Sequence, residues 1–337
     1  MADESSVVDK AQDGAVAEAI SEGHLELVTS PHQHTGWTTS RIMWTVTIAL
    51  LPSLLAGLWY FGPAVLAPVL GATVGAVGCE WILARINKKV GTIPDGSAFL
   101  TGFLLGLVLP PGFSPVLAAL GGVVAIGLGK AVFGGLGDNI FNPALVGRAF
   151  LQASFPAGMT NWSLAVEKVD AVSQATPLGL FKFGEPAQYM SDIATSKLLL
   201  GNVGGCIGET SSLAIIVGGI ILLITKVAHW RIMASMILGG IVFSEFFYLI
   251  GVGPGPLFDI FAGGFLFGAV FMATDYVTSP TTTRGQWIFG AGIALLTILI
   301  RRFGGLPEGV MYAILLMNAA VPLINRGTRP RLFGAQS

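Results

Sequence analysis

The sequence predicts an all-α, polytopic integral membrane protein with about ten transmembrane helices. Of its 337 residues, 53% are hydrophobic and only 11% are charged, and the mean hydropathy is +0.74. A water-soluble domain carries about 25% charged residues, so this chain has too few to cover a surface that faces water. Glycine contributes 46 residues, which indicates closely packed or interrupted membrane helices. Membrane lipid is therefore the expected surrounding.

The charge balance and the cysteine count exclude several kinds of partner and site. The net charge of −1 provides no basic surface for nucleic acid. Cys79 and Cys206 are too few for an iron–sulfur cluster, which needs about four thiolates, and too few for a disulfide framework. We therefore expect no nucleic-acid partner, and we interpret both cysteines as small apolar packing residues.

Apolar segments alternate with short polar connections along the whole chain. Several are long enough to cross a membrane, which takes about 20 residues, but three are too short. Short or interrupted apolar segments at matching positions indicate discontinuous helices around a central site. The ten segments are residues 42–61, 64–84, 98–111, 115–133, 144–158, 212–228, 232–251, 257–273, 286–300 and 308–324, of which 98–111, 144–158 and 257–273 are the short ones.

The two halves of the chain contain similar stretches in the same order. Residues 102–108 (GFLLGLV) resemble residues 264–270 (GFLFGAV), and residues 133–136 (FGGL) are repeated at 303–306. Five spans in each copy is an odd number, so the second copy is inserted upside down. The sequence thus predicts two inverted five-helix repeats with short broken helices.

These patterns divide the chain into five parts. We expect a polar N-terminal tail (1–36), a first membrane repeat (37–158), an outer loop (159–211), a second membrane repeat (212–326) and a C-terminal tail (327–337). Lysine and arginine are concentrated in the connections on the side that holds both ends of the chain. By the positive-inside rule both termini are cytoplasmic and the outer loop is periplasmic.

The outer loop contains a short polar motif, residues 173–178 (SQATPL). Pro177 biases Thr176 toward an extended backbone. No neighbouring histidine or lysine would activate the Thr176 hydroxyl as a nucleophile. Residue chemistry alone therefore predicts a turn here.

Several separate motifs resemble the RnfD/NqrB family of membrane redox subunits. The resemblance covers residues 30–334 and rests on residues 38–43 (TTSRIM), 134–139 (GGLGDN) with 141–144 (FNPA), 173–178 (SQATPL), 274–275 (TD) followed by 277–278 (VT), and 303–309 (FGGLPEG). In that family the threonine of S-x-A-T is esterified to the phosphate of FMN. The resemblance implies covalent FMN on Thr176, with Ser173 as part of the attachment motif, and makes the chain a flavoprotein modified through a phosphoester. A separate flavin transferase forms this bond, which accounts for the missing base.

Two asparagines before a short apolar segment have two interpretations. Asn142 is a candidate N-cap with Pro143 at the first helical position, and Asn139 belongs to the preceding turn. The resemblance instead associates Asn139 and Asn142 with a second, non-covalent flavin, riboflavin. An amide side chain can cap a helix and can also form hydrogen bonds with the edge of a flavin ring, so both interpretations stay open.

Asp275 ends a short apolar segment and is followed by several hydroxyl residues. An acid among oxygens suits a hard cation such as Na⁺, and the alternative is a cap at a broken helix. Tyr276 follows where the family usually has proline. Four more charged residues fall in or near apolar segments: Glu80, Lys130, Arg148 and Glu245. Lys130 and Arg148 either extend to the inner membrane interface or pair with one of the two acids. Glu80 or Glu245 could instead line an ion path.

The resemblance implies a function in electron transfer. The chain would be the flavin-carrying subunit of the Rnf electron transport complex in the bacterial inner membrane, a translocase that couples ferredoxin and NAD redox chemistry to Na⁺ or H⁺ movement. Its partners would be RnfA, RnfB, RnfC, RnfE and RnfG, and it would catalyse no complete reaction alone. The alternatives are an NqrB-type subunit of the Na⁺-translocating NADH:quinone reductase, and a solute channel or transporter with inverted repeats.

Overall fold

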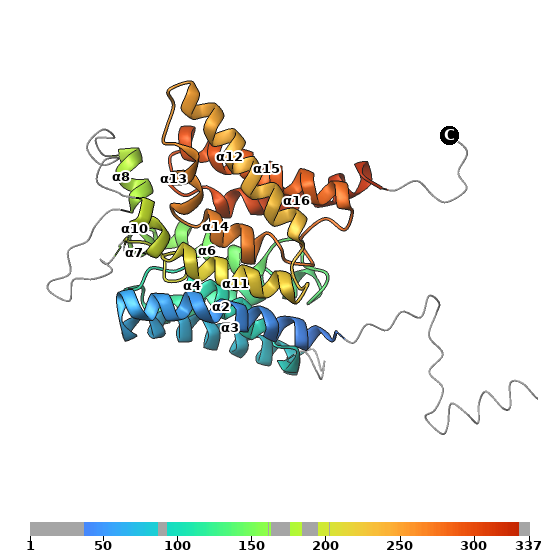
Figure 1. Ribbon diagram of the computed structural model, residues 1–337. Coiled ribbons are helices and arrows are strands. Elements are labelled where there is room, and N and C mark those ends of the chain that lie inside the picture. The colour runs from blue at the N-terminus through green and yellow to red at the C-terminus, as the bar shows by residue number, and fades with distance from the viewer. Residues whose placement is uncertain are drawn as a thin grey trace, which may run out of the picture. The chain divides into compact units, whose positions relative to one another are not determined.

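The computed structural model describes residues 37–86, 93–160, 162, 176–183, 195–201 and 203–329. The chain divides into two units after Thr38, and every helix discussed below lies in the second unit (Figure 1). All regular structure in the described residues is helical. This confirms the all-α prediction.

The helices form two sets joined by a connection with short helices. The first set is α2 (Thr39–Phe61), α3 (Leu66–Ile86), α4 (Ser97–Leu107), α5 (Pro115–Gly127) and α6 (Pro143–Ser154). The connection contains α7 (Pro156–Met159), α8 (Pro177–Phe183) and α10 (Thr195–Leu200). The second set is α11 (Ser212–Ile224), α12 (Trp230–Leu249), α13 (Pro256–Phe261), α14 (Phe265–Phe267) with the π-helical segment η4 (Gly268–Met272), α15 (Thr283–Phe303) and α16 (Val310–Gly327).

Length and composition identify the helices that can cross a membrane. Within the described ranges six qualify, and α4 and α11 are shorter apolar helices. Large apolar side chains such as Leu55, Val116 and Leu238 are more than half exposed, as expected for a surface that faces lipid rather than water. The chain is therefore a multi-pass membrane protein. The six spans are Thr39–Phe61, Pro63–Ile86, Pro115–Phe133, Trp230–Leu249, Thr283–Phe303 and Val310–Gly327.

The two sets repeat the same packing relations. In the first set α3 packs mainly on α4 and α5, and α5 packs on α6. In the second set α12 packs on α13 and α15, and α15 packs on α16. The similar stretches found in the sequence, residues 102–108 and 264–270, lie in α4 and in the α14–η4 segment. Equivalent stretches thus occupy equivalent positions in the two sets.

Equivalent helices run in opposite directions. Helices α2 and α11 lie side by side (Figure 1). Gly57, late in α2, faces Ile207 just before α11 begins, whereas Ala49, earlier in α2, faces Gly218 within α11. The two helices are therefore antiparallel, as an inverted repeat requires.

The two short central segments stop inside the structure, and residues outside their own helix set supply partners for their last carbonyls. After α4, the Leu107 carbonyl accepts from the N–H of Gly208 at 2.7 Å, and the Leu109 carbonyl accepts from the N–H of Ile207 at 3.2 Å. After η4, the Met272 carbonyl accepts from Nδ2 of Asn142 at 3.2 Å. An unsatisfied carbonyl in lipid costs several kcal/mol, so these contacts hold the two sets together.

Close packing of α3 and α5 gives a test of the fold. A methyl group at Gly75 would clash with the Ala119 carbonyl, whereas a methyl group at Gly78 on the same helix meets nothing within 4 Å. We expect Gly75→Ala to destabilise the protein by about 1–3 kcal/mol. Gly78→Ala should be neutral or stabilising by up to about 1 kcal/mol, because alanine favours helix over glycine. Thermal unfolding in detergent measures both, and equal effects would contradict the proposed packing.

Candidate functional site

Two pockets contain the residues that the sequence singled out. The first, here the asparagine pocket, has Lys130, Asn139, Asn142, Thr274 and Asp275 in a mostly apolar lining. The second, here the threonine pocket, is lined by residues of the outer-loop connection and of the second helix set, namely Thr176, Pro177, Leu178, Val203, Gly204, Gly205, Glu209, Thr210, Phe261, Gly263 and Glu308. The fold thus brings Asn139, Asn142 and Asp275 together and places Thr176 elsewhere.

Helix α11 separates the two pockets. Thr210, just before α11, lines the threonine pocket, and Leu222, near its end, lines the asparagine pocket. Twelve residues of helix span roughly 18 Å. The start of α2 contributes Met43 to the asparagine pocket. The pockets therefore lie toward opposite ends of the helix bundle.

Asn142 is the N-cap of α6, as the sequence predicted. Its Oδ1 accepts from the N–H groups of Ala144 at 3.0 Å and Leu145 at 3.4 Å, and Pro143 is the first helical residue. Asn139 closes the preceding turn, because its Oδ1 accepts from the N–H of Gly137 at 3.4 Å and its Nδ2 donates to a backbone carbonyl at 3.2 Å. Each amide nitrogen carries two hydrogens and donates one here, so each retains a donor for a ligand.

Asp275 lies in the connection between η4 and α15. It accepts from the Thr278 hydroxyl at 3.1 Å and the N–H of Val277 at 3.5 Å. Burial raises the pKa of Asp275, while these two hydrogen bonds lower it. The N-cap of α15 is instead Thr282, whose hydroxyl accepts from Gly285. Asp275 therefore stabilises a turn and does not cap the following helix.

A buried ion pair forms one wall of the asparagine pocket. Lys130 donates to the two carboxylate oxygens of Glu80 at 2.8 and 2.9 Å and to the hydroxyl of Ser97 at 2.6 Å. Lys130 and Glu80 are at most 5% exposed. Lys130 thus does not extend to a membrane interface, and the sequence did not specify which acid it would meet.

Thr176 is buried at the entrance to α8. Its hydroxyl oxygen accepts from the N–H of Gly179 at 3.1 Å, and its carbonyl accepts from Leu180 at 2.8 Å. Thr176 therefore caps α8 while its side chain borders the threonine pocket. Ser173 lies outside the described residues.

A second group of buried charges lies beside the threonine pocket. Arg148 donates to Glu209 at 3.2 Å, to Sγ of Cys206 at 3.4 Å and to Glu308. Arg148 therefore does not extend to a membrane interface, because it is 5% exposed and paired with two carboxylates that border the pocket of Thr176. Cys206, Glu209 and Glu308 are close enough to share a metal ion, but the guanidinium already donates to all three, so we assign no metal there.

Sequence reasoning did not single out Glu209 as a site residue. It follows a glycine in a loop and carries no motif of its own, and Glu308 was noted only as part of the stretch 303–309. Both acids are site residues because Arg148 donates to them, and Arg148 is 61 residues from Glu209 and 160 residues from Glu308 along the chain. No local pattern indicates such a contact.

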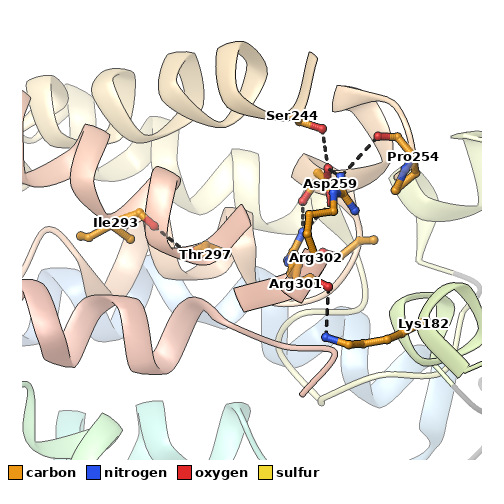
Figure 2. A network of polar contacts seen from close by, with 9 residues as sticks. Lys182, Ser244, Pro254, Asp259, Ile293, Thr297, Arg301 and Arg302 are labelled. Carbon is orange, nitrogen blue, oxygen red and sulfur yellow. Dashed lines mark hydrogen bonds and ion pairs between the residues drawn. The ribbon is translucent and has the colours of Figure 1, made fainter. Parts of the chain in front are cut away.

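Helix α8 is anchored to the end of α15. Lys182 donates to the carbonyls of Ile300 at 3.3 Å, Arg301 at 3.1 Å and Leu306 at 2.8 Å, and Figure 2 shows its side chain pointing at that helix end. Burial lowers the pKa of Lys182, and the positive charge of Arg302 lowers it further. The anchor fixes the helix that Thr176 begins.

The same end of α15 is tied to α13 through Asp259 (Figure 2). Both Arg301 and Arg302 pair with the Asp259 carboxylate, and Ser244 donates to it. Arg301 also donates to the Ala262 carbonyl at 3.0 Å. One buried acid therefore joins three helices beside the threonine pocket.

The model of the NQR2, RnfD, RnfE family matches residues 26–334. The chain belongs to this family. The resemblance to the RnfD/NqrB family that the motifs indicated is thereby confirmed.

Curated relatives cover almost the whole family region. The chain is 43% identical over 330 residues to the RnfD subunit of the proton-translocating ferredoxin:NAD(+) oxidoreductase complex of Clostridium ljungdahlii, covering 95% of this chain and 100% of the relative. It is 42% identical over 317 residues to the corresponding subunit of the Na(+)-translocating complex of Acetobacterium woodii, covering 94% and 97%. It is 36% identical over 346 residues to the corresponding subunit of the ion-translocating oxidoreductase complex of Actinobacillus succinogenes, covering 92% and 98%.

The Lys130–Glu80 pair gives a stability test for this family member. Lys130→Met should cost about 3–5 kcal/mol, because it leaves the buried Glu80 carboxylate without a partner. The double variant Lys130→Met/Glu80→Gln should recover part of this loss, since no buried charge remains. Thermal unfolding in detergent compares the two. Equal stability of the single and double variants would show that the pair is not buried as described.

Proposed function

We propose that this chain is the RnfD subunit of an Rnf-type ferredoxin:NAD oxidoreductase complex, a membrane electron-transport machine that translocates ions. The full-length match to three relatives, each named as this same component of such a complex, supports this, and so does the polytopic helical fold. The names of two relatives specify a proton and a sodium ion, so the proposal covers either ion. The quinone reductase subunit and the solute channel are not favoured by these names.

The other Rnf subunits are the proposed partners. RnfA, RnfB, RnfC, RnfE and RnfG would supply the sites for ferredoxin, NAD and further redox groups. Both cysteines are free thiols, and Cys206 is a partner of Arg148. This chain alone would therefore transfer electrons without completing the reaction.

We propose that Thr176 carries FMN through a phosphoester. The observation that supports this most is that Thr176 lines a pocket with three glycines in its wall, Gly204, Gly205 and Gly263. Esterification removes the hydroxyl hydrogen but leaves the oxygen lone pairs. The hydrogen bond from Gly179 that closes the first turn of α8 is therefore compatible with the modification.

The bound flavin would supply reversible electron transfer, and the chain would determine its position and surroundings. Lys182 holds α8 against the end of α15, so Thr176 would present the phosphate from a fixed point. Ser173 would belong to the motif that the flavin transferase recognises.

The start of α2 and the end of α16 lie on one side of the helix bundle, and together with the loop charges this supports our proposal of a cytoplasmic location for both termini in the inner membrane. The N–H of Thr281, just before α15, donates to Asn325 near the end of α16, and Asp275, from the same connection, lines the asparagine pocket together with Met43 of α2. The first helix thus begins and the last helix ends on the same side as the asparagine pocket. The threonine pocket would then be periplasmic, in agreement with the loop charges.

Thr176→Ala should abolish covalent flavin, because it removes the only atom through which the proposed ester forms. Thr160→Ala serves as the matched control, since Thr160 is an exposed threonine in the same connection whose hydroxyl, among the described residues, bonds only to its own turn. The full chain is produced with its flavin transferase and analysed by fluorescence after denaturing electrophoresis and by intact mass. The control should gain the mass of FMN less one water. A fluorescent Thr176→Ala band would overturn the assignment.

We also propose that the asparagine pocket binds riboflavin without a covalent bond. Its lining is mainly apolar with a few polar groups, which suits a flat ring with polar edges. The amide hydrogens of Asn139 and Asn142 that donate no bond within the described residues can donate hydrogen bonds to those edges. Asp275, in the lining of the same pocket, is our proposed ligand for a coupling cation, because its carboxylate lies beside the Thr278 hydroxyl and Thr274 lines the pocket with it.

Two variants separate these roles. Asn139→Leu should lower the flavin that acid extraction releases while leaving the covalent flavin unchanged, because it removes a donor from one pocket only. Asp275→Asn should retain the released flavin but weaken the dependence of electron transfer on Na⁺ concentration in the assembled complex. Released flavin is measured by chromatography. Unchanged flavin in Asn139→Leu, or unchanged Na⁺ dependence in Asp275→Asn, would refute the corresponding assignment.

A further inference from the structure

Within the ion cluster around Arg148, beside the threonine pocket, carboxylates outnumber guanidinium groups, and Arg301 of the neighbouring Asp259 cluster interacts with Glu308 alone of these acids. One guanidinium, that of Arg148, faces the two carboxylates of Glu209 and Glu308. Arg148 is 5% exposed and Glu209 is 6% exposed. An uncompensated buried charge is costly, so such a group takes up a proton or an ion. The Lys130–Glu80 pair at the other pocket, by contrast, is balanced.

One oxygen of Glu209 has no partner. Oε1 accepts from Arg148 at 3.2 Å, but Oε2 is buried and accepts no hydrogen bond within the described part of the chain. A carboxylate oxygen without a donor carries the full cost of desolvation, whereas a protonated carboxyl is neutral and can itself donate. Glu209 lines the pocket that Thr176 also lines, so this acid belongs to the proposed flavin site.

The groups that face Glu209 come from several elements. Arg148 reaches it from α6, Glu308 from the connection between α15 and α16, and Cys206 from its own turn, while the backbone of Gly264 lies against its carboxyl group. Burial raises the pKa of Glu209 to about 7, Arg148 and a side-chain hydrogen bond with Cys206 oppose this rise, and Glu308 adds to it. Glu209 is thus close to the point at which a small change in local charge alters its protonation.

Glu308 gives this buried acid a connection to solvent. Its side chain is 20% exposed, compared with 4% for Glu209, and both contact the same guanidinium. Carboxylate oxygens of the two acids lie within 4.8 Å of one another, so Glu308 is the more exposed neighbour through which a proton from water would reach Glu209.

We propose that Glu209 binds one proton when the flavin on Thr176 gains an electron and releases it when the electron leaves. This rests on the proposed function. A one-electron carrier of a partner subunit supplies the electron, which adds one negative charge beside Glu209. A proton from water forms an O–H bond at Oε2. Oxidation of the flavin by the next carrier removes that charge, the O–H bond breaks, and the proton returns to water.

The coupling is reciprocal. Charges in a poorly hydrated pocket interact more strongly than in water, so an electron on the flavin favours protonated Glu209. By linkage, the proton on Glu209 raises the midpoint potential of the flavin. The protonation state of Glu209 would therefore adjust the midpoint potential of the flavin, although Glu209 is not part of the attachment motif.

The test is the pH dependence of the flavin midpoint potential, measured spectroelectrochemically in the full chain carrying covalent FMN. Near pH 7 the unsubstituted protein should show a component of up to about 59 mV per pH unit for one proton per electron. Glu209→Gln should lose this component while keeping the flavin. Glu245→Gln makes the same chemical change on α12, away from both pockets, and should leave the slope unaltered.

A second variant retains the titrating group in case Glu209→Gln does not fold. Glu308→Gln removes a negative charge that raises the pKa of Glu209, so the bend in the curve of potential against pH should move to lower pH with its slope intact. An unchanged slope in folded, flavin-loaded Glu209→Gln, or an unmoved bend in Glu308→Gln, overturns the inference. Absence of flavin from the unsubstituted chain would instead overturn the proposed function, and the inference with it.

Discussion

The structure depends on how two interrupted helices satisfy their last carbonyls where water is excluded. Gly208, which precedes α11, donates to the end of α4, and Asn142, which precedes α6, donates to the end of η4. In each case the donor comes from outside the helix set that contains the break. Since an unpaired carbonyl in lipid costs several kcal/mol, the two sets stabilise each other. Asn142, one of these donors, also lines the asparagine pocket.

Buried charges distinguish the two pockets. At the asparagine pocket the Lys130 ammonium group donates to both oxygens of one carboxylate and to a hydroxyl, so each of its three N–H bonds has an acceptor. At the threonine pocket Arg148 meets two carboxylates, and one oxygen of Glu209 is left without a donor. A balanced pair leaves no net buried charge and serves structure. An unbalanced one responds to nearby charge, which is what a site beside a redox group requires.

The end of the protein that contains the threonine pocket combines a rigid frame with this responsive group. Asp259 joins Arg301, Arg302 and Ser244, and Lys182 connects α8 to the same helix end. The frame keeps Thr176 at the border of its pocket, so a tethered group would have a defined position relative to Glu209. The energy of these buried contacts comes from pairing within a poorly hydrated region, where a broken pair costs more than in water.

The sequence by itself determined the features that depend on composition and on near neighbours along the chain. These are the all-α membrane class, the short central segments, the N-cap at Asn142 followed by Pro143, and the family. Only the tertiary structure decided which charges meet. It paired Lys130 with Glu80, placed Arg148 beside the pocket of Thr176, and made Glu209 a candidate for proton exchange. Such contacts join residues 50 or more positions apart, and helix packing, which no local pattern encodes, sets their burial and therefore their energy.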